Sequence, residues 1–227
     1  KTQIINGMNK ETLVRPYMLF NEKLFRLEIY RTCEGNYLFL DLHHIVADGT
    51  SLAIIMNDIN RAYSGEKLEP ETYTSYDLAL DNRDALAGDI YKNAEGYYRS
   101  VFENAGGSIS FYPDKSGAVP TAELYRRETA EISVQGVKEF CKKHGITENV
   151  FFISAFGITL GKYNFKKDAV FTTIYHGRND SRLSETVGML VKTLPVYCNF
   201  AGSTEQCLTE VQKQLINSMN NDIYPFS

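Results

Sequence analysis

The chain has 227 residues, 43% of them hydrophobic, so it can bury one large core or the cores of two small lobes. Its formal net charge is −4, and no run of Lys or Arg exceeds two residues. This charge pattern argues against a nucleic-acid surface or a polybasic membrane anchor, and it favours proteins or small molecules as partners.

Cysteine spacing and the lack of a long apolar run indicate where the protein works. The four cysteines are scattered without a C-x-x-C pair: Cys33, Cys141, Cys198 and Cys207. This usage is typical of reduced cytosolic thiols and predicts neither a zinc site nor a disulfide framework. No window approaches the roughly 18 apolar residues that cross a bilayer, and the stretch KTQIINGMNKETLVRP does not resemble a signal peptide. We therefore expect a cytoplasmic protein.

The first quarter of the chain predicts a β-hairpin followed by a helix. Apolar residues alternate over residues 24–30 and 37–43, on either side of the turn-like TCEGN. If the second strand runs on to His44, then His43 and His44 point to opposite faces. After Gly49, apolar residues recur at the spacing of an amphipathic helix. The stretch LHHIVADGTSL therefore lies where a strand turns into a helix.

The middle of the chain predicts helices and then a linker. Residues 76–104 have helical apolar spacing and stop at Gly106 and Gly107. The stretch SISFYPDKSGAVPTAE is rich in Gly, Pro and Ser, which is typical of a linker. We therefore divide the chain into residues 1–115, a first lobe with the two adjacent histidines, and residues 116–227, most of a second lobe.

The second lobe predicts alternating strands and helices. Strands are expected over residues 124–132, 169–175 and 190–200. Helices should follow the capping residues Ser133, Thr147 and Ser203. The helix over residues 150–163 is apolar on nearly all sides, so we expect it to be buried.

The chemistry is concentrated in the H-H-x-x-x-D-G stretch. Side chains on opposite faces of a strand cannot converge on one metal, so we predict no metal site at His43 and His44. One histidine can be held structurally while the other faces a cavity as a base; the alternative is two structurally satisfied histidines. Asp48 has an alternative role as a helix N-cap, and Gly49 permits a tight, left-handed turn. Because this spacing arises by chance in on the order of one in several thousand chains, we favour the functional interpretation.

The stretch HHIVADGTSL resembles the signature of the condensation domains of nonribosomal peptide synthetases. The wider chloramphenicol-acetyltransferase-like superfamily shares H-x-x-x-D-G. Further stretches resemble family motifs in family order: RPYMLFNEKLFRLEIY, HGRND, VGMLVKTLPV and DIYPF. The resemblance spans about Arg15 to Phe226. It implies an α/β, two-lobed chloramphenicol-acetyltransferase-like fold, with mixed sheets flanked by helices and incomplete at the N- and C-termini.

The chain departs from the family pattern at two motifs. In YTSYDLA, Ser75 and Ala79 stand where the family has Asp and Trp. The Asn-Thr pair of another motif is replaced by Lys192 and Thr193, so an extra cation is available there for a phosphate or an acidic partner.

The resemblance also implies missing ends, because such domains begin well before and continue well beyond the matched motifs. We expect a piece of a longer domain, or a chain completed by another polypeptide. The family's Arg partner for Asp48 is expected in the absent N-terminal part, which leaves Arg178 as the only substitute within the chain. A buried carboxylate without a partner is costly.

The implied function is peptide-bond-forming acyl transfer. Donor and acceptor carrier proteins, with adjacent synthetase modules, would present phosphopantetheine arms to a tunnel between the lobes, and the domain itself would bind no cofactor, nucleic acid or membrane. His44 would be the catalytic residue, supported by His43, Asp48 and Gly49. Candidate residues of the tunnel or the lobe interface are Arg178, Lys192, Thr193 and His176.

Two other functions remain open. The first is another acyltransferase or an epimerisation domain. Epimerisation domains resemble V-G-W-F-T where this chain has VGMLV, and the plant acyltransferase motif D-F-G-W-G needs a Trp that the chain lacks. The second is a noncatalytic module that docks carrier proteins, which the missing ends favour and the intact His44 disfavours.

Overall fold

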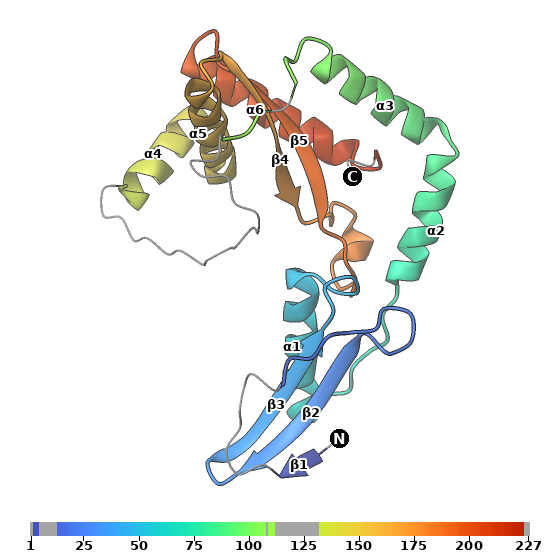
Figure 1. Ribbon diagram of the computed structural model, residues 1–227. Helices are drawn as coiled ribbons and strands as arrows, with labels where there is room; N and C mark the ends of the chain where they lie inside the picture. Colours follow the sequence, from blue (N-terminus) through green and yellow to red (C-terminus); the bar gives the residue numbers. More distant parts are fainter. Residues whose placement is uncertain (1, 5–12, 108, 112–131, 225–227) are drawn as a thin grey trace, which may run out of the picture. The chain divides into compact units, whose positions relative to one another are not determined.

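The computed structural model describes residues 2–4, 13–107, 109–111 and 132–224 (Figure 1). The chain forms two compact units, which we describe separately. The first unit is Lys1–Asp81 with Arg178–Val191, and the second is Asn82–Gly177 with Lys192–Ser227. We call Arg178–Val191 the return segment, because it belongs to the first unit although the second unit flanks it in sequence.

The compact units do not divide where the lobe boundary is predicted. Their boundary lies between Asp81 and Asn82, within a helix, and the return segment adds a second crossing. The predicted boundary between residues 115 and 116 falls in residues 112–131, outside the described residues, as do most of the linker and nearly all of the predicted strand over 124–132. The division into lobes at this point stays a prediction.

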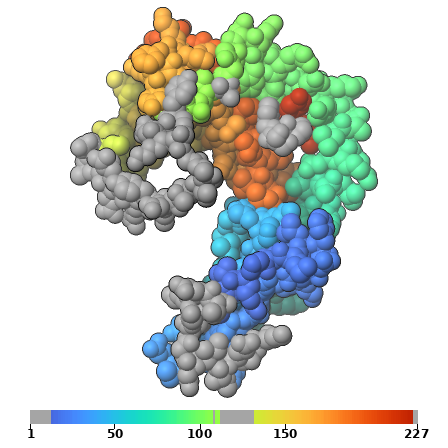
Figure 2. Space-filling model, in the orientation of Figure 1, coloured from blue at the N-terminus to red at the C-terminus, as the bar shows by residue number. Residues whose placement is uncertain are grey.

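A three-stranded sheet and a long helix build the first unit. Strand β1 (Thr2–Ile4) is parallel to β2 (Phe25–Thr32), and β2 is antiparallel to β3 (Gly35–Leu42). Helix α1 (Gly49–Tyr63) follows, so the predicted hairpin and helix are confirmed. In the space-filling view, the blue residues near the N-terminus lie directly against the light-blue region that contains α1 (Figure 2). The shorter elements are α2 (Ser75–Leu86), which begins in this unit, and the 3-10 turn η2 (Ser181–Leu183).

Strand β3 ends at Leu42, before both histidines. The His43 N–H still donates to the Leu24 carbonyl at 3.0 Å. The Val46 N–H then donates to the His43 carbonyl at 3.1 Å, which turns the chain away from the sheet. His44 therefore lies in a turn, and the expectation that strand alternation separates the two imidazoles is wrong.

The second unit packs helices on a two-stranded sheet. Strands β4 (Asp168–Tyr175) and β5 (Lys192–Asn199) are antiparallel, with Asp168 opposite Asn199. The helices are α3 (Asp89–Phe102), α4 (Val134–His144), α5 (Glu148–Tyr163) and α6 (Thr204–Asn220). No described helix combines the length and apolar character that a bilayer span requires.

Local capping explains where the helices of the second unit begin. The side chains of Ser133 and Thr147 accept the backbone N–H groups of Gly136 and Val150 at the starts of α4 and α5. Ser203 forms a capping box with Gln206 at the start of α6. These three predicted helix starts are confirmed, because each depends only on residues within one turn.

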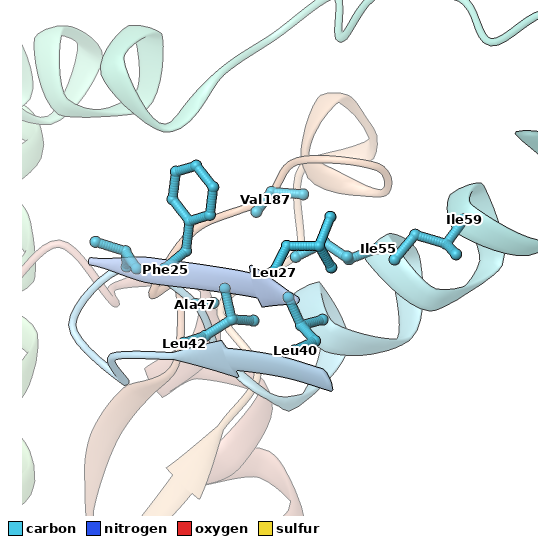
Figure 3. A pocket seen from close by; sticks show the side chains of 9 residues that line it. Phe25, Leu27, Leu40, Leu42, Ala47, Ile55, Ile59 and Val187 are labelled. Carbon is cyan, nitrogen blue, oxygen red and sulfur yellow. The ribbon is translucent and has the colours of Figure 1, made fainter. Parts of the chain in front are cut away.

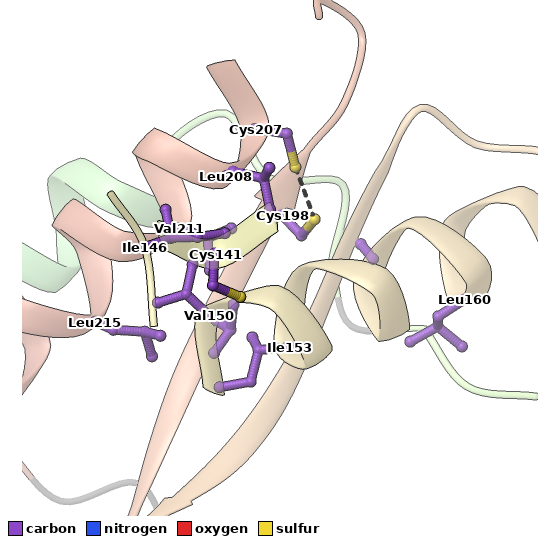
Figure 4. Close-up of a cluster of buried hydrophobic side chains, with 12 residues drawn as sticks. Cys141, Ile146, Val150, Ile153, Leu160, Cys198, Cys207, Leu208, Val211 and Leu215 are labelled. Carbon is purple, nitrogen blue, oxygen red and sulfur yellow. Dashed lines mark hydrogen bonds between the residues drawn. The ribbon is translucent and has the colours of Figure 1, made fainter. Parts of the chain in front are cut away.

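The core of the second unit lies where α4, α5 and α6 meet the sheet (Figure 4). Its buried side chains are mainly aliphatic and include three cysteines: Cys141, Ile146, Val150, Ile153, Leu160, Ala169, Val196, Cys198, Cys207, Leu208, Val211 and Leu215. The thiols of Cys198 and Cys207 lie 3.4 Å apart, and both are free. A core of this kind stabilises the unit by removing apolar surface from water.

Helix α5 buries one side rather than all sides. Phe152 and Phe156 are 52% and 46% exposed, so the prediction that this helix is buried rather than at the surface is wrong. On its buried side, a Cβ on Gly157 would lie 2.7 Å from the Cys198 Sγ atom, and one on Gly161 would lie 2.5 Å from the Phe200 ring. The two glycines therefore let α5 approach β5 closely, which an apolar pattern alone does not reveal.

Candidate functional site

The two histidines lie in residues 43–48, which we call the His-His turn and which joins β3 to α1. His43 is held in place. Its Nδ1 atom accepts the Ile45 N–H at 3.1 Å, and its ring meets the edge of the Tyr17 ring at 5.7 Å. An accepting Nδ1 leaves the proton of a neutral imidazole on Nε2. His43 is thus the structurally held member of the pair.

The support for His43 extends into the lead-in motif RPYMLFNEKLFRLEIY. The Tyr17 hydroxyl donates to the Asp41 carbonyl at 2.9 Å, and the Arg26 guanidinium lies 3.7 Å above the Tyr17 ring. Arg26 also pairs with the Asp41 carboxylate at 2.9 Å and donates to the Arg15 carbonyl at 2.7 Å. The sequence pattern alone did not single out Tyr17 as a site residue.

His44 is exposed, in contrast to His43. Among the described residues, no hydrogen bond to its ring is formed. Its imidazole can therefore accept a proton from, or donate one to, a molecule that reaches the turn. The turn thus leaves the His44 imidazole exposed and holds the His43 imidazole against the protein.

Asp48 is buried at the start of α1 and its carboxylate is saturated with donors. Oδ1 accepts from the Ser51 N–H, the Ser51 hydroxyl and Arg178 Nη2, at 2.8, 2.9 and 3.2 Å. Oδ2 accepts from Arg178 Nη1 at 2.9 Å and from the Leu190 N–H at 3.1 Å. Burial alone would raise the pKa of Asp48, but these hydrogen bonds hold it at about 2. Asp48 is the N-cap of α1, as one prediction had it, and it has no free lone pair with which to act as a base.

Arg178, in the return segment, is the charge partner of Asp48. The fork of the guanidinium meets the carboxylate bidentately, and the two side chains are 6% and 0% exposed. Its Nη2 atom also donates to the Ser51 hydroxyl at 3.1 Å and to the Thr186 carbonyl at 3.0 Å. Asp48 is therefore paired within the chain, by the residue nominated as the only substitute for the family's Arg.

The return segment is fastened to the first unit at several more points. The Thr186 hydroxyl donates to the Tyr73 carbonyl at 2.6 Å, and the Val187 N–H donates to Glu71 Oε1 at 2.8 Å. The Arg182 guanidinium lies 4.3 Å from the centre of the Tyr73 ring. The last three residues of HGRND and all of VGMLV lie in this segment, which is therefore fixed beside the His-His turn.

Gly49 does not adopt the left-handed conformation that the sequence allows for it. It is the first residue of α1, and its φ lies outside the left-handed region. Space around it is open, since a Cβ would meet no atom within 4 Å. The turn is instead shaped by the Val46 hydrogen bond and by the buried Asp48.

The other three candidates belong to the second unit. Lys192 begins β5, and its Nζ atom contacts Asp222 Oδ1 at 2.9 Å and the Asp222 carbonyl at 3.2 Å. The extra cation is therefore paired within the chain, which corrects the expectation that it is available to a phosphate or an acidic partner. Thr193 is the next residue of β5 and is exposed. His176 follows β4, with its ring 4.7 Å from that of Tyr175.

An apolar cavity of about 390 Å³ lies beside the His-His turn within the first unit (Figure 3). Side chains from β2, β3 and α1 surround it, together with two from the turn and one from the return segment: Phe25, Leu27, Leu40, Leu42, Val46, Ala47, Ile55, Ile59 and Val187. None of these side chains ionises, so the cavity lining itself supplies no acid or base. In the described part of the chain, no three His, Cys, Asp or Glu side chains gather as a metal-ligand set.

Several site residues were missed by sequence reasoning. Ser51 and Leu190 bond the Asp48 carboxylate directly, and Thr186 holds Arg178. Ser51 lies within the quoted HHIVADGTSL, and its place three residues after an N-cap was a usable signal. The Leu190 N–H bonds Asp48, which lies 142 positions earlier in the chain, and Thr186 holds Arg178 through its backbone carbonyl. The spacing of residue types in the sequence reveals neither contact.

Comparison with known proteins places this architecture. The condensation domain family model matches residues 1–227, and the chain belongs to that family. The chain is 28% identical over 221 residues to bacitracin synthase 2 of Bacillus licheniformis, covering 94% of this chain and 8% of that protein. It is 28% identical over 225 residues to surfactin synthase subunit 1 of Bacillus subtilis (strain 168), covering 95% of this chain and 6% of that protein. The chain thus spans only a small part of these relatives.

Solved structures share the fold. The X-domain in its complex with OxyB from teicoplanin biosynthesis matches with a TM-score of 0.78 at 18% identity, over 100% of this chain and 55% of that one. The first condensation domain of the calcium-dependent antibiotic synthetase, bound to a substrate analogue, matches with a TM-score of 0.66 at 18% identity, over 89% of this chain and 47% of that one. The α/β chloramphenicol-acetyltransferase-like fold expected from the resemblance is confirmed.

Proposed function

We propose that this chain carries the His-His turn of a site that joins the acyl or peptidyl thioester of a donor carrier protein to the amine of an aminoacyl acceptor carrier. The nitrogen attacks the thioester carbonyl, an amide forms and the donor thiol leaves. The observation that carries the proposal is the division of roles in the turn. His43 and Asp48 are held by the protein, and His44 is exposed and unbonded by the described residues. Membership of the condensation domain family supports it.

The role of His44 follows from the energetics of the amine. An α-amine has a pKa near 7.7–8.0, so about a tenth is neutral at pH 7 and supplying the neutral form costs only about 1.4 kcal/mol. Deprotonating the substrate is therefore not the main barrier. Orienting the amine and managing charge in the tetrahedral intermediate are harder. An imidazole can accept the ammonium proton or stabilise the oxyanion, and such help is typically worth about 10² to 10⁴ in rate.

Asp48 and Arg178 have a supporting role in this proposal. Their bidentate pair fixes the start of α1 and the return segment, between which the His-His turn is held. An Asp with a pKa of about 2 stays ionised at neutral pH, so it neither donates nor accepts the transferred proton.

The proposed partners are carrier proteins. Their phosphopantetheine arms would bring both substrates, so the chain itself needs no resident cofactor. The relatives are named as a bacitracin synthase and a surfactin synthase subunit, and the chain matches a small part of each, which suits a domain that works on substrates delivered by its neighbours.

An intact-mass assay tests the proposal. Two carrier proteins, one loaded with an acyl group and one with an amino acid, are mixed with this chain or with a version extended at both ends. We expect the acceptor to gain the mass of the acyl group in the extended protein, with loss of that gain in His44→Ala. His144→Ala, which removes a partly exposed His of the second unit, is the matched control and should transfer normally.

The assay also distinguishes the proposed function from the main alternative, a noncatalytic docking module. If the extended protein binds both carriers and never transfers the acyl group, the chain is a docking module. Transfer that is unaffected by His44→Ala would remove His44 from the mechanism.

A further inference from the structure

Ser51 has a buried hydroxyl that helix capping does not require. It is the third residue of α1, and its backbone N–H already donates to the Asp48 carboxylate that caps the helix. The residue is 0% exposed. Buried hydroxyl groups in proteins have hydrogen-bond partners, so the partners of this one indicate its role.

The Ser51 hydroxyl uses its full hydrogen-bonding capacity. It accepts the Gly188 N–H at 3.0 Å and a hydrogen of Arg178 Nη2 at 3.1 Å. Both groups can only donate, so they occupy the two lone pairs of the oxygen. Its single hydrogen has two acceptors within reach, the Gly188 carbonyl at 2.8 Å and Asp48 Oδ1 at 2.9 Å. One oxygen atom thus joins the helix cap, the arginine and the return segment.

Gly188 is held on both sides of its backbone. Its N–H donates to Ser51, and its carbonyl accepts from Ser51 and from the Asp48 backbone N–H at 3.2 Å. A Cβ on Gly188 would lie 3.0 Å from both the Leu190 Cδ1 atom and the Ser75 Cβ atom. A side chain at this position would crowd Leu190 and Ser75 at the start of α2. This close packing explains why a glycine at position 188, in the stretch VGMLV, suits the fold of this chain.

We propose that Ser51 is a positioning residue: its hydroxyl fixes the return segment against the start of α1 and so sets the geometry of Asp48 and Arg178 behind the His-His turn. Ser51 touches no reacting group. The use of this geometry in acyl transfer rests on the proposed function, whereas the contacts of Ser51 are independent of it.

Removing the hydroxyl should loosen the return segment locally. In Ser51→Ala, the Gly188 N–H loses its acceptor inside the protein, which is unfavourable for a buried donor. Arg178 keeps its bonds to Asp48 and to the Thr186 carbonyl, so the ion pair remains. The return segment should therefore open more often while the rest of the first unit stays folded.

Amide hydrogen exchange measured by NMR tests this. We expect the Gly188 amide to exchange at least about tenfold faster in Ser51→Ala than in the wild type, with no change at Leu160 in the second unit. Ser51→Thr keeps the hydroxyl and should restore protection. The matched control is Thr50→Ala, which removes an exposed hydroxyl from the preceding residue and should leave Gly188 unchanged.

Unchanged Gly188 exchange in folded Ser51→Ala would overturn the proposal. If that variant does not fold, the exchange rate of the Gly188 amide in the wild type tests the proposal instead. Exchange as fast as that of the exposed Gly107 amide would also overturn the proposal, and strong protection of the Gly188 amide would support it. Loss of acyl transfer activity in the carrier assay is a separate readout. A protein that protects Gly188 and never transfers an acyl group would refute the proposed function and leave the role of Ser51 intact.

Discussion

Replacing Arg178 by Met should destabilise the first unit strongly. The substitution removes the bidentate partner of Asp48 and leaves a carboxylate with 0% side-chain exposure, bonded only by Ser51 and the Leu190 N–H. Removing one partner of a buried ion pair typically costs about 3–5 kcal/mol. Whole domains are stable by only about 5–15 kcal/mol, so the loss should be large in a urea unfolding curve.

The pH dependence of this loss is a sharper test than its size. In the wild type, the Asp48 pKa of about 2 lies below its ordinary value of 3.8, so its stabilisation is present above about pH 4 and is lost as the pH falls through 2. That difference is worth about 2.5 kcal/mol. In Arg178→Met, burial should raise the Asp48 pKa, so the variant loses stability as the pH rises through that value. The stability difference between the two proteins should therefore grow from about pH 3 to pH 7.

The assay is urea unfolding at several pH values, with Arg61→Met as the matched control. Arg61 pairs with Asp58 and Glu66 at the surface, with 42% of its side chain exposed, and surface pairs contribute about 0–1 kcal/mol. If Arg178→Met costs no more than Arg61→Met, or if its cost does not change with pH, the reasoning about a buried, paired Asp48 is refuted.

Three further predictions concern the second unit and the thiols. Lys192→Asn should lower the free energy of unfolding by about 1 kcal/mol or less, because it breaks the ion pair with Asp222. In urea titrations this difference from wild type should shrink in 1 M salt, and a loss that does not depend on salt would contradict an ion-pair role. Gly157→Ala should lower stability by about 1–3 kcal/mol, because the added Cβ would lie 2.7 Å from Cys198, and an unchanged melting temperature would show that α5 does not pack this closely. A thiol-reactive dye should label one cysteine in the native protein, exposed Cys33, and all four in denaturant; rapid native labelling of the buried three would contradict the described core.

The elements that the sequence predicted correctly depend on neighbouring residues. Ser133, Thr147 and Ser203 cap their helices through bonds to residues three positions away, and the hairpin follows from alternation around a short turn. Such signals are readable because a cap or a turn needs few partners. The error at β3 has the same origin, since alternation continues through His43 while the chain already turns at that residue.

The site was only partly predictable, because its geometry depends on contacts between distant parts of the chain. The motif and the resemblance led to His43, His44, Asp48 and Arg178, but not to the buried Ser51. The pairing of Lys192 with a residue 30 positions away was likewise hidden, because a lysine in an unusual position gives no indication of its partner.

The most direct test of the central claim is the single-turnover rate of amide formation, measured with loaded donor and acceptor carriers for the extended wild-type protein and for His44→Ala. The account predicts a rate lowered by about 10² to 10⁴ in the variant, with both carriers still bound. Equal rates in the two proteins would contradict the assignment of His44 as the residue that handles charge in the reaction.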